Sequence, residues 1–435
     1  MISRHDVLIV GGGVTGTALL YVLSRYHPNI KKITLLEKYS GVAQVNSHPL
    51  NNAQTSHDGG TETNYSLKHA LEVQKAAVLL RAYVEEHAVP GLFKKTHRMV
   101  LAVGAKEIQE LRERFLEFKP FYPDLRLAER EELADIEPMV VLGRREDEPI
   151  LGLVSTEGYA INYQKLSESF VENARVFNPN VRVLFDTEVT DLKKTGNWFV
   201  LETNRGTHMA PTLVFAAGAY SLLYAQKLGY TMHLGILPVA GNFYSAGRLL
   251  RGKVYRPQIK GIPFAAIHGD PDVLNENDTR FGPTTKPLPL MERHRLNTFF
   301  DFVRLPIVSL RGLWVLLTIL ANKNLLWYVC KNVLYDIPLV GTFLFLKEAR
   351  VIVPTLQYKD LSLRKGAGGT RPQSVDLETG ELEMGDKTIV GNGCIFNTTP
   401  SPGASVCLAN ATRDAAIVQQ FFQKHVVSKE NPPAV

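Results

Sequence analysis

The chain has 435 residues, of which 45% are hydrophobic and 21% charged, and its formal net charge is +6. This composition is ordinary for a folded globular protein and excludes a disordered or collagen-like chain. The length exceeds what one compact core usually holds, so we expect two domains or two interleaved lobes. Its three cysteines, Cys330, Cys394 and Cys407, form no CxxC pair. They therefore predict neither a disulfide framework nor a zinc site, and they favour a reducing compartment.

The N-terminal region has the pattern of a βαβ unit that holds an adenine dinucleotide. Residues 7–10 predict a buried strand, a glycine-rich turn leads into a helix that continues to about residue 26, and residues 33–36 predict a second strand. In the turn, Gly11 permits the tight bend, Gly13 lets the backbone approach the pyrophosphate, and Gly16 lets the helix pack on the strand. The free N–H groups at the start of the helix would face the phosphates.

Glu37 directly follows the second predicted strand. A carboxylate at this position accepts hydrogen bonds from the ribose hydroxyls, which completes the dinucleotide pattern. The first strand begins within about six residues of Met1, which leaves no room for a signal peptide. We therefore expect the protein to stay in the compartment where it is made.

Further elements follow from hydrophobic periodicity. Helices are predicted over 65–87, 106–118 and 404–425, and strands over 181–185, 187–190, 198–202, 212–218 and 391–396. The strand over 212–218 ends in Ala-Ala-Gly, and such small residues let the backbone pass close beside a dinucleotide. We therefore predict a discontinuous cofactor domain of residues 1–75, 150–220 and 388–435, with a substrate domain of residues 76–149 and 221–387.

The region 299–350 is the most apolar part of the chain. Its longest uncharged run, Gly312–Asn322, has 11 residues, whereas a membrane-spanning helix needs about 20. Tryptophans and phenylalanines alternate here with Lys and Arg, as they do on surfaces that lie in a membrane interface. Two interpretations stay open: a membrane-facing helical region, or core helices of the substrate domain. No recognised nucleic-acid module accompanies the basic residues, so an anionic membrane surface or an acidic substrate fits them better.

Five short motifs in order resemble the malate:quinone oxidoreductase family. They are residues 51–58 (NNAQTSHD), 267–270 (IHGD), 280–283 (RFGP), 369–373 (GTRPQ) and 396–405 (FNTTPSPGAS). The likeness is strongest to the shorter bacterial form and covers essentially the whole chain. The sister family, L-2-hydroxyglutarate oxidase, shares several of the motifs in the same order. Family members often carry Gly where this chain has Gln54 and Ser56, which bears on the shape of the pocket beside His57.

The resemblance implies an α/β fold, α+β overall. A Rossmann-like FAD-binding domain of the glutathione-reductase/D-amino-acid-oxidase type would be interleaved with a substrate domain of mixed antiparallel sheet and helices. It implies FAD-dependent oxidation of (S)-malate to oxaloacetate, with electrons passed to a membrane quinone, as a tricarboxylic acid cycle enzyme does. The alternatives are L-2-hydroxyglutarate oxidation by the same chemistry and, from another class, a non-catalytic flavoprotein on the membrane surface.

The reaction implied transfers hydride to flavin N5 while a base takes the hydroxyl proton. Two imidazoles compete for that role. His268 follows a strand-like run, 264–268, that would point it towards the flavin, and a neutral imidazole is a suitable acceptor near neutral pH. His57 lies in the loop that the fold brings to the flavin ring. We favour His268, and we keep His57 as the second candidate.

A dicarboxylate needs two anion anchors. Arg371 is the first candidate because a guanidinium binds a carboxylate through two parallel hydrogen bonds. Arg280 is the second, and for both arginines the competing interpretation is a structural salt bridge. Gln373, two residues after Arg371, would face the same side of a strand. Tyr244 is a candidate for lining the same cavity.

The remaining cofactor contacts come from the same resemblance and from the helix that follows residue 404. Free N–H groups at the start of that helix would stabilise the negative charge of reduced flavin. The predicted cofactor contacts besides Gly11, Gly13, Gly16 and Glu37 are Asn52, Thr55, Val189, Ala217, Gly218, Pro400, Ser401, Gly403 and Ala404. We expect non-covalent FAD, no metal, no nucleic acid, and peripheral binding to an anionic membrane at the cytoplasmic face.

Overall fold

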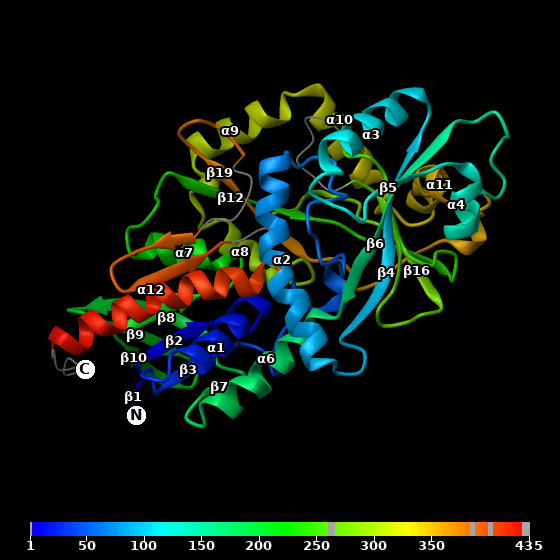
Figure 1. Ribbon diagram of the computed structural model, residues 1–435. Coiled ribbons are helices and arrows are strands. Elements are labelled where there is room, and N and C mark those ends of the chain that lie inside the picture. Colours follow the sequence, from blue (N-terminus) through cyan, green and yellow to red (C-terminus); the bar gives the residue numbers. More distant parts are fainter. Residues whose placement is uncertain (1, 260–265, 383–387, 399–402, 429–435) are drawn as a thin grey trace.

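The computed structural model describes residues 2–259, 266–382, 388–398 and 403–428. In Figure 1 the elements that contain both termini form one lobe and the long strands β4 (Phe93–Val103) and β6 (Ile150–Ile161) belong to the other. The chain passes between the two lobes several times.

A six-stranded sheet forms the centre of the first lobe. Its strands, in spatial order, are β20 (Thr388–Val390), β21 (Cys394–Asn397), β11 (Thr212–Phe215), β2 (Val7–Val10), β3 (Ile33–Leu36) and β7 (Arg182–Leu184). All neighbours are parallel except β20, which runs antiparallel to β21. Parallel strands covered on both faces read as continuous apolar runs, and this explains why β2 and β3 coincide with their predictions.

Helices cover one face of this sheet, and a smaller sheet covers the other. The helices on the first face are α1 (Val14–Tyr26), α2 (Leu67–His87), α6 (Tyr163–Phe177) and α12 (Cys407–Ser428). The second face packs against α7 (Tyr220–Lys227) and against the sheet of β1 (Ile2–Arg4), β10 (Gly206–Ala210), β9 (Trp198–Thr203) and β8 (Val189–Thr195). Within β2, Val7 and Ile9 belong to the first core and Leu8 and Val10 to the second.

An eight-stranded sheet forms the second lobe. Its order is β18 (Ser362–Leu363), β13 (Tyr244–Gly247), β16 (Asp278–Gly282), β15 (His268–Pro271), β14 (Lys253–Tyr255), β4, β6 and β5 (Arg126–Ala128). Helix α3 (Ala105–Phe118) packs on one face, and α4 (Arg130–Ile136), α5 (Pro138–Val141) and α11 (Val340–Ile352) pack on the other. A further sheet of β17 (Lys286–Pro287), β12 (Leu234–Ala240) and β19 (Thr370–Asp376) packs into the second core of the first lobe.

Two predicted domain boundaries are displaced. Strand β6 pairs with β4 along nearly its whole length, so residues 150–161 belong to the second sheet and not to the cofactor domain. Helix α2 buries Leu80, Tyr83 and Val84 in the core of the first lobe, so that lobe extends past residue 75. Both differences come from long-range pairing and packing, which local periodicity does not report.

Most predicted elements lie where the sequence placed them, with differences at their ends. Strand β11 ends at Phe215 because the chain turns at Ala216–Gly218, where Gly218 has a φ of +57°. The closing helix α12 begins at Cys407 instead of residue 404. The predicted run 264–268 overlaps the undescribed residues, and the strand that contains His268 begins at that residue.

The apolar region 299–350 is largely helical and largely on the surface. It contains α8 (Phe299–Phe302), α9 (Leu310–Leu320), α10 (Lys323–Leu334) and the start of α11. Trp314 is 70% exposed and Trp327 is 69% exposed, whereas Val315 and Leu325 are buried. In the described part of the chain, no single helix is long and apolar enough to cross a membrane. Helices α9 and α10 reach that length and composition only together, with a 93° bend between them.

Candidate active site

A cavity of about 900 Å³ extends from the glycine-rich turn of the first lobe to the sheet of the second. At one end it is lined by Gly11, Gly13 and Glu37, and at the other by His57, His268 and Arg371. One continuous space therefore joins the predicted dinucleotide site to the predicted catalytic residues.

The glycines of the turn stand where no side chain fits. At Gly11, which has a φ of +110°, a Cβ atom would lie 2.4 Å from the carbonyl oxygen of Ala216. At Gly16 a Cβ atom would lie 2.0 Å from the carbonyl oxygen of Gly11. The backbone of the turn is thus pressed against β11 and against its own helix, which keeps the wall at Gly11 and Gly13 free of side chains.

Glu37 lies in the same wall and is 8% exposed. Its Oε2 accepts a hydrogen bond of 2.6 Å from the N–H of Gly12, and its Oε1 accepts one of 2.9 Å from the N–H of Tyr39. Burial raises the pKa of Glu37, and these two backbone hydrogen bonds oppose the shift. The carboxylate is therefore fixed beside the cavity, as a ribose ligand must be. The glycine wall, this acid and the cavity volume together fit a bound FAD.

The other predicted cofactor contacts divide into three groups. Those that line the cavity are Asn52, Thr55, Val189, Ala217, Gly218, Gly403 and Ala404. Gly16 supports the turn from behind, through its contact with Gly11. Pro400 and Ser401 lie outside the described residues.

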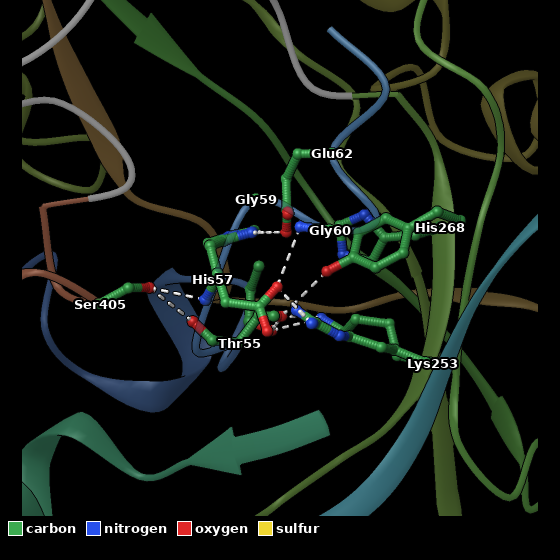
Figure 2. A network of polar contacts seen from close by, with 12 residues as sticks. Thr55, His57, Gly59, Gly60, Glu62, Lys253, His268 and Ser405 are labelled. Atoms are coloured by element: carbon green, nitrogen blue, oxygen red, sulfur yellow. Dashed lines mark hydrogen bonds and ion pairs between the residues drawn. The ribbon is translucent and has the colours of Figure 1, made fainter. Parts of the chain in front are cut away.

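His57 forms a pair with a carboxylate that the motifs did not indicate. Its Nδ1 lies 2.7 Å from Oε1 of Glu62, and its backbone N–H donates to Oγ of Ser405 at 2.9 Å (Figure 2). Burial alone would keep Glu62 neutral, but the hydrogen bond from His57 and the charges of His57, Arg98 and Arg114 lower the pKa of Glu62 to about 2. In a neutral imidazole the hydrogen bond to the ionised carboxylate takes the hydrogen on Nδ1, which leaves the lone pair on Nε2.

His268 also lines the cavity but lies deeper, with 2% exposure. Its Nδ1 lies 3.3 Å from the carbonyl oxygen of Ala266, and its Nε2 lies 3.4 Å from Oδ1 of Asp270. Burial, followed by the charge of Lys253, lowers the pKa of His268 to about 3, and Asp270 only partly opposes the shift. The imidazole is therefore neutral, as predicted from the sequence, but it is a weak base.

Arg371 faces the cavity from β19, opposite Val239 of β12. Within the described ranges, no carboxylate lies within 4.0 Å of its guanidinium, and the groups that act on its charge are the hydroxyls of Tyr65 and Tyr328. Burial lowers the pKa of Arg371, as expected of a cation that has lost water and gained no anion. In the part of the chain that the structure describes, Arg371 has no salt bridge of the kind that the competing interpretation requires.

Three predicted substrate ligands do not line this cavity. Arg280 is fully buried, with Nη2 at 2.5 Å from Oδ2 of Asp270 and Nη1 at 3.2 Å from the carbonyl oxygen of Asn52, so it has the structural salt bridge considered as its alternative. Tyr244 stacks on Phe345 in the core of the second lobe. Gln373 is 3% exposed and also lies outside the cavity wall.

Sequence reasoning missed several groups of this site. Glu62 lies only five residues after His57, and Asp270 stands within the quoted motif at 267–270, so proximity was a usable signal for both. Lys253 and Tyr255 lie on β14, which no motif marks, and only the sheet brings them beside Thr55 and His268.

The chain is similar to proteins of one known family over nearly its whole length. The family model for malate:quinone oxidoreductase (Mqo) matches residues 3–434. A probable malate:quinone oxidoreductase from Campylobacter jejuni is 40% identical over 97% of this chain and 96% of its own length. A malate:quinone oxidoreductase from Helicobacter pylori is 36% identical, with the same coverage of both chains.

Solved structures confirm the predicted fold class. An FAD-bound L-α-glycerophosphate oxidase from Mycoplasma pneumoniae superposes with a TM-score of 0.68 at 20% identity, over 96% of this chain and 95% of its own. That likeness concerns the fold, whereas the family follows from the match over nearly the whole sequence and from the two relatives at 36–40% identity. On these grounds the chain is an oxidoreductase that belongs to the malate:quinone oxidoreductase family.

Proposed function

We propose that this protein binds FAD without a covalent bond, oxidises (S)-malate to oxaloacetate and passes the electrons to a membrane quinone. The observation that carries the proposal is the continuity of one cavity between the dinucleotide wall, the His57–Glu62 pair and the guanidinium of Arg371, which has no carboxylate partner among the described residues. Membership of the malate:quinone oxidoreductase family supplies the substrate and the acceptor.

The first lobe holds the cofactor. Gly11 and Gly13 form the wall against the pyrophosphate, the start of α1 directs its N–H groups to it, and Glu37 accepts from the ribose hydroxyls. When bound, FAD supplies the acceptor for the hydride that leaves C2 of malate. The described residues of the site provide the binding, the orientation and the proton transfer that accompany that step.

His57 is the better-placed base of the two histidines. Glu62 holds the hydrogen on Nδ1 and leaves Nε2 as a lone pair, and the side chain retains 18% exposure beside the cavity. His268, with a pKa of about 3, is far from the range in which a base is efficient near neutral pH. For these reasons we propose His57 as the base in place of the His268 preferred from the sequence. In this mechanism the hydroxyl proton of malate moves to Nε2 of His57 while Glu62 stabilises the resulting imidazolium.

Arg371 orients the substrate. The described residues provide no carboxylate partner for its guanidinium. A carboxylate of malate would be that partner and would bind it through two parallel hydrogen bonds. Charge attraction then fixes the substrate at one end, while the base contacts its hydroxyl group. Such fixed geometry contributes to the rate because the reacting groups need not be brought together in the transition state.

The apolar surface of α9 and α10 is proposed to lie in the interface of an anionic membrane, on its cytoplasmic face. We call this the α9–α10 surface; its exposed apolar residues are Leu310, Leu313, Trp314, Leu317, Leu326, Trp327, Val333 and Leu334. Arg304, Arg311 and Lys323 are exposed around it. Tryptophan next to Arg and Lys is typical of helices that lie in the interface, and such a position would bring the protein to its quinone.

One dye-reduction experiment tests the function. The purified protein should reduce an artificial electron acceptor with (S)-malate, and much more slowly with L-2-hydroxyglutarate at equal concentration. Acid precipitation should release all the yellow colour as FAD into the supernatant. A preference for 2-hydroxyglutarate would assign the protein to the sister activity, and colour retained in the pellet would show a covalent flavin.

A further inference from the structure

A second, much smaller cavity lies behind the active site in the second lobe. We call it the chamber. Its volume is about 20 Å³, enough for about one water molecule. Its inner wall is formed by the buried side chains of Arg98, Lys253 and Asp270, and its outer wall includes the exposed Lys94 and Arg251. The chamber therefore lies between a buried cluster of charges and the surface.

Thr55 lines both the active-site cavity and the chamber. On one side, the hydroxyl of Tyr255, which lines the active-site cavity, donates to Oγ1 of Thr55 at 3.5 Å. On the other side, Nζ of Lys253 donates to the same Oγ1 and, at 2.7 Å, to the carbonyl oxygen of Ala53 (Figure 2). Oγ1 of Thr55 thus accepts from a donor on each side of the wall between the two spaces, while its own hydrogen goes to the carbonyl oxygen of Ala53 at 2.9 Å. A neutral Lys253 could accept that hydrogen once the hydroxyl turns towards it.

The inner wall of the chamber has polar atoms that need a partner. Oδ1 of Asp270 and Nη1 of Arg98 are buried, and neither has a hydrogen-bond partner among the described residues. Oδ1 of Asp270 faces Nζ of Lys253 at 3.6 Å and Nε2 of His268 at 3.4 Å. Buried polar atoms beside a space of this size are normally satisfied by water. The chamber therefore has the size and the polar lining of a site for one water molecule beside Lys253.

Lys253 is the group in this wall that can exchange a proton near neutral pH. Burial, assisted by the charge of Arg280, lowers the pKa of Lys253 to about 8, while Asp270 and Glu62 oppose the shift. The charged or titratable groups around it are Asp270 and His268 on β15, Arg280 on β16, Arg98 on β4, Tyr255 on β14 and Glu62 before α2. Arginine cannot replace it in this role, because a guanidinium stays protonated.

We propose that Lys253 transfers protons between the active-site cavity and the chamber, through Thr55 and Tyr255, so that the chamber is the proton exit of the enzyme. The proposal rests on the proposed function. When malate is oxidised, the C2–H bond breaks and its electron pair leaves with the hydrogen to FAD, a C2=O bond forms, and the hydroxyl proton goes to His57. When FAD and the substrate fill the cavity, water is excluded from it. The proton on His57 therefore needs a route other than the cavity mouth before the next turnover. Lys253 releases one proton to water in the chamber and takes up another from the cavity side.

The test compares proton release with flavin reduction in one turnover. The holoenzyme is mixed with malate under anaerobic conditions, and flavin absorbance and a pH-indicator dye are followed together. In the unaltered protein both signals should have the same rate. In Lys253→Met and in Lys253→Arg, proton release should lag behind flavin reduction by about 100-fold, the lower range of what a positioned proton-transfer group contributes. Equal rates in Lys253→Arg would overturn the proposal, because that variant keeps the cation and loses only the exchangeable proton.

Lys286→Met is the matched control. Lys286 is also a buried lysine, its pKa is lowered by burial, and it pairs with Asp336 away from the walls of both cavities. Its variant should keep the two rates equal. Thermal melting of each variant checks folding, and Lys253→Arg decides the question if Lys253→Met does not fold.

Two measurements separate this proposal from the proposed function. In the oxidised holoenzyme, the His268 pKa measured by NMR should rise in Lys253→Met, because the charge of Lys253 lowers it in the unaltered protein. An unchanged pKa would show that Lys253 carries no charge next to His268 and would contradict its place in the relay. If malate fails to reduce the flavin, the proposed function falls. Proton uptake during photoreduction of the bound FAD then tests the relay in the same variants, and a lag confined to the Lys253 variants supports it, whereas no lag refutes it.

Discussion

Nδ1 of His57 lies 2.7 Å from Oε1 of Glu62, and the two residues are only five positions apart in the chain. The loop between them turns back because Asp58 accepts a hydrogen bond of 3.0 Å from the N–H of Gly60 and forms ion pairs with Arg81 and Arg98. The loop that carries His57 and Glu62 is thus anchored to both lobes by the ion pairs of Asp58. Nε2 of His57 remains available to the cavity that this residue lines.

The first prediction concerns this pair. His57→Ala should lower the rate of flavin reduction at saturating malate by about two to four orders of magnitude, the usual contribution of a positioned base. Glu62→Gln should lower the same rate less and leave KM nearly unchanged, since it acts through the orientation of His57. His97→Ala is the control, because His97 forms a similar pair with Glu137 at 2.9 Å outside the cavity. A larger loss in His268→Ala than in His57→Ala would reverse our assignment.

The glycine wall gives a second prediction. In Gly16→Val the new side chain meets the carbonyl oxygen of Gly11, which lies 2.0 Å from the Cβ position. The purified variant should contain about a tenth of the normal FAD or less, because losing one hydrogen bond to a charged phosphate weakens binding about tenfold or more. Gly247→Ala, where no atom lies within 4 Å of the added Cβ, should keep its FAD. The ratio of flavin to protein absorbance measures both, and full occupancy in Gly16→Val would show that the turn is not the cofactor wall.

Arg371 gives a third prediction. Arg371→Lys should raise the KM for malate by about 10- to 100-fold, because an ammonium cannot form the two parallel hydrogen bonds of a guanidinium. The maximal rate should change much less. Arg248→Lys at the exposed Arg248 serves as control. Steady-state kinetics with an artificial acceptor gives both constants, and an unchanged KM would place the carboxylate anchor elsewhere.

His268 gives a prediction on acid stability. The pKa of its buried imidazole is about 3, against 6.5 for the free group. Between these values the unfolded chain binds a proton that the folded protein does not, so stability falls as pH drops from 6.5 towards 3. In His268→Gln the slope of the unfolding free energy against pH should therefore be smaller over this range, by the equivalent of about one bound proton. His5, whose pKa is lowered to about 4, acts in the same direction and should maintain part of the slope. Urea unfolding at a series of pH values measures this, and parallel curves for both proteins would contradict it.

The α9–α10 surface gives a fifth prediction. Trp314 and Trp327 replaced together by Ser should leave dye-linked malate oxidation intact but impair turnover with a long-tailed quinone in anionic vesicles. High salt should release the unaltered protein only in part, since it screens the basic residues and not the apolar ones. Leu116 and Val176, each 74% exposed on other helices, form the matched double Ser control. Loss of FAD or of folding in the tryptophan variant would show that the two side chains are needed for core packing and not for membrane binding.

The sequence by itself determined the parts of this protein that depend on short-range pattern. The strand over 7–10, the glycines at 11, 13 and 16, and Glu37 lie within about 30 consecutive residues, so their geometry is fixed by one local βαβ unit. Strand alternation alone did not decide the substrate contacts, because Arg371 lines the cavity and Gln373, two residues further along β19, does not.

Only the tertiary structure decided which groups meet across the lobes. Tyr244 and Arg280 were expected in the cavity, but the sheet turns Tyr244 onto Phe345 and Arg280 onto Asp270. Lys253 is about 200 positions from Thr55 and about 15 from His268, and it reaches both because β14 pairs with β15 on one side and β4 on the other. The pKa values follow from the same cause. Burial among other charges, and not residue type, makes His268 a weak base, and this is why we propose His57, paired with Glu62, as the base of the site.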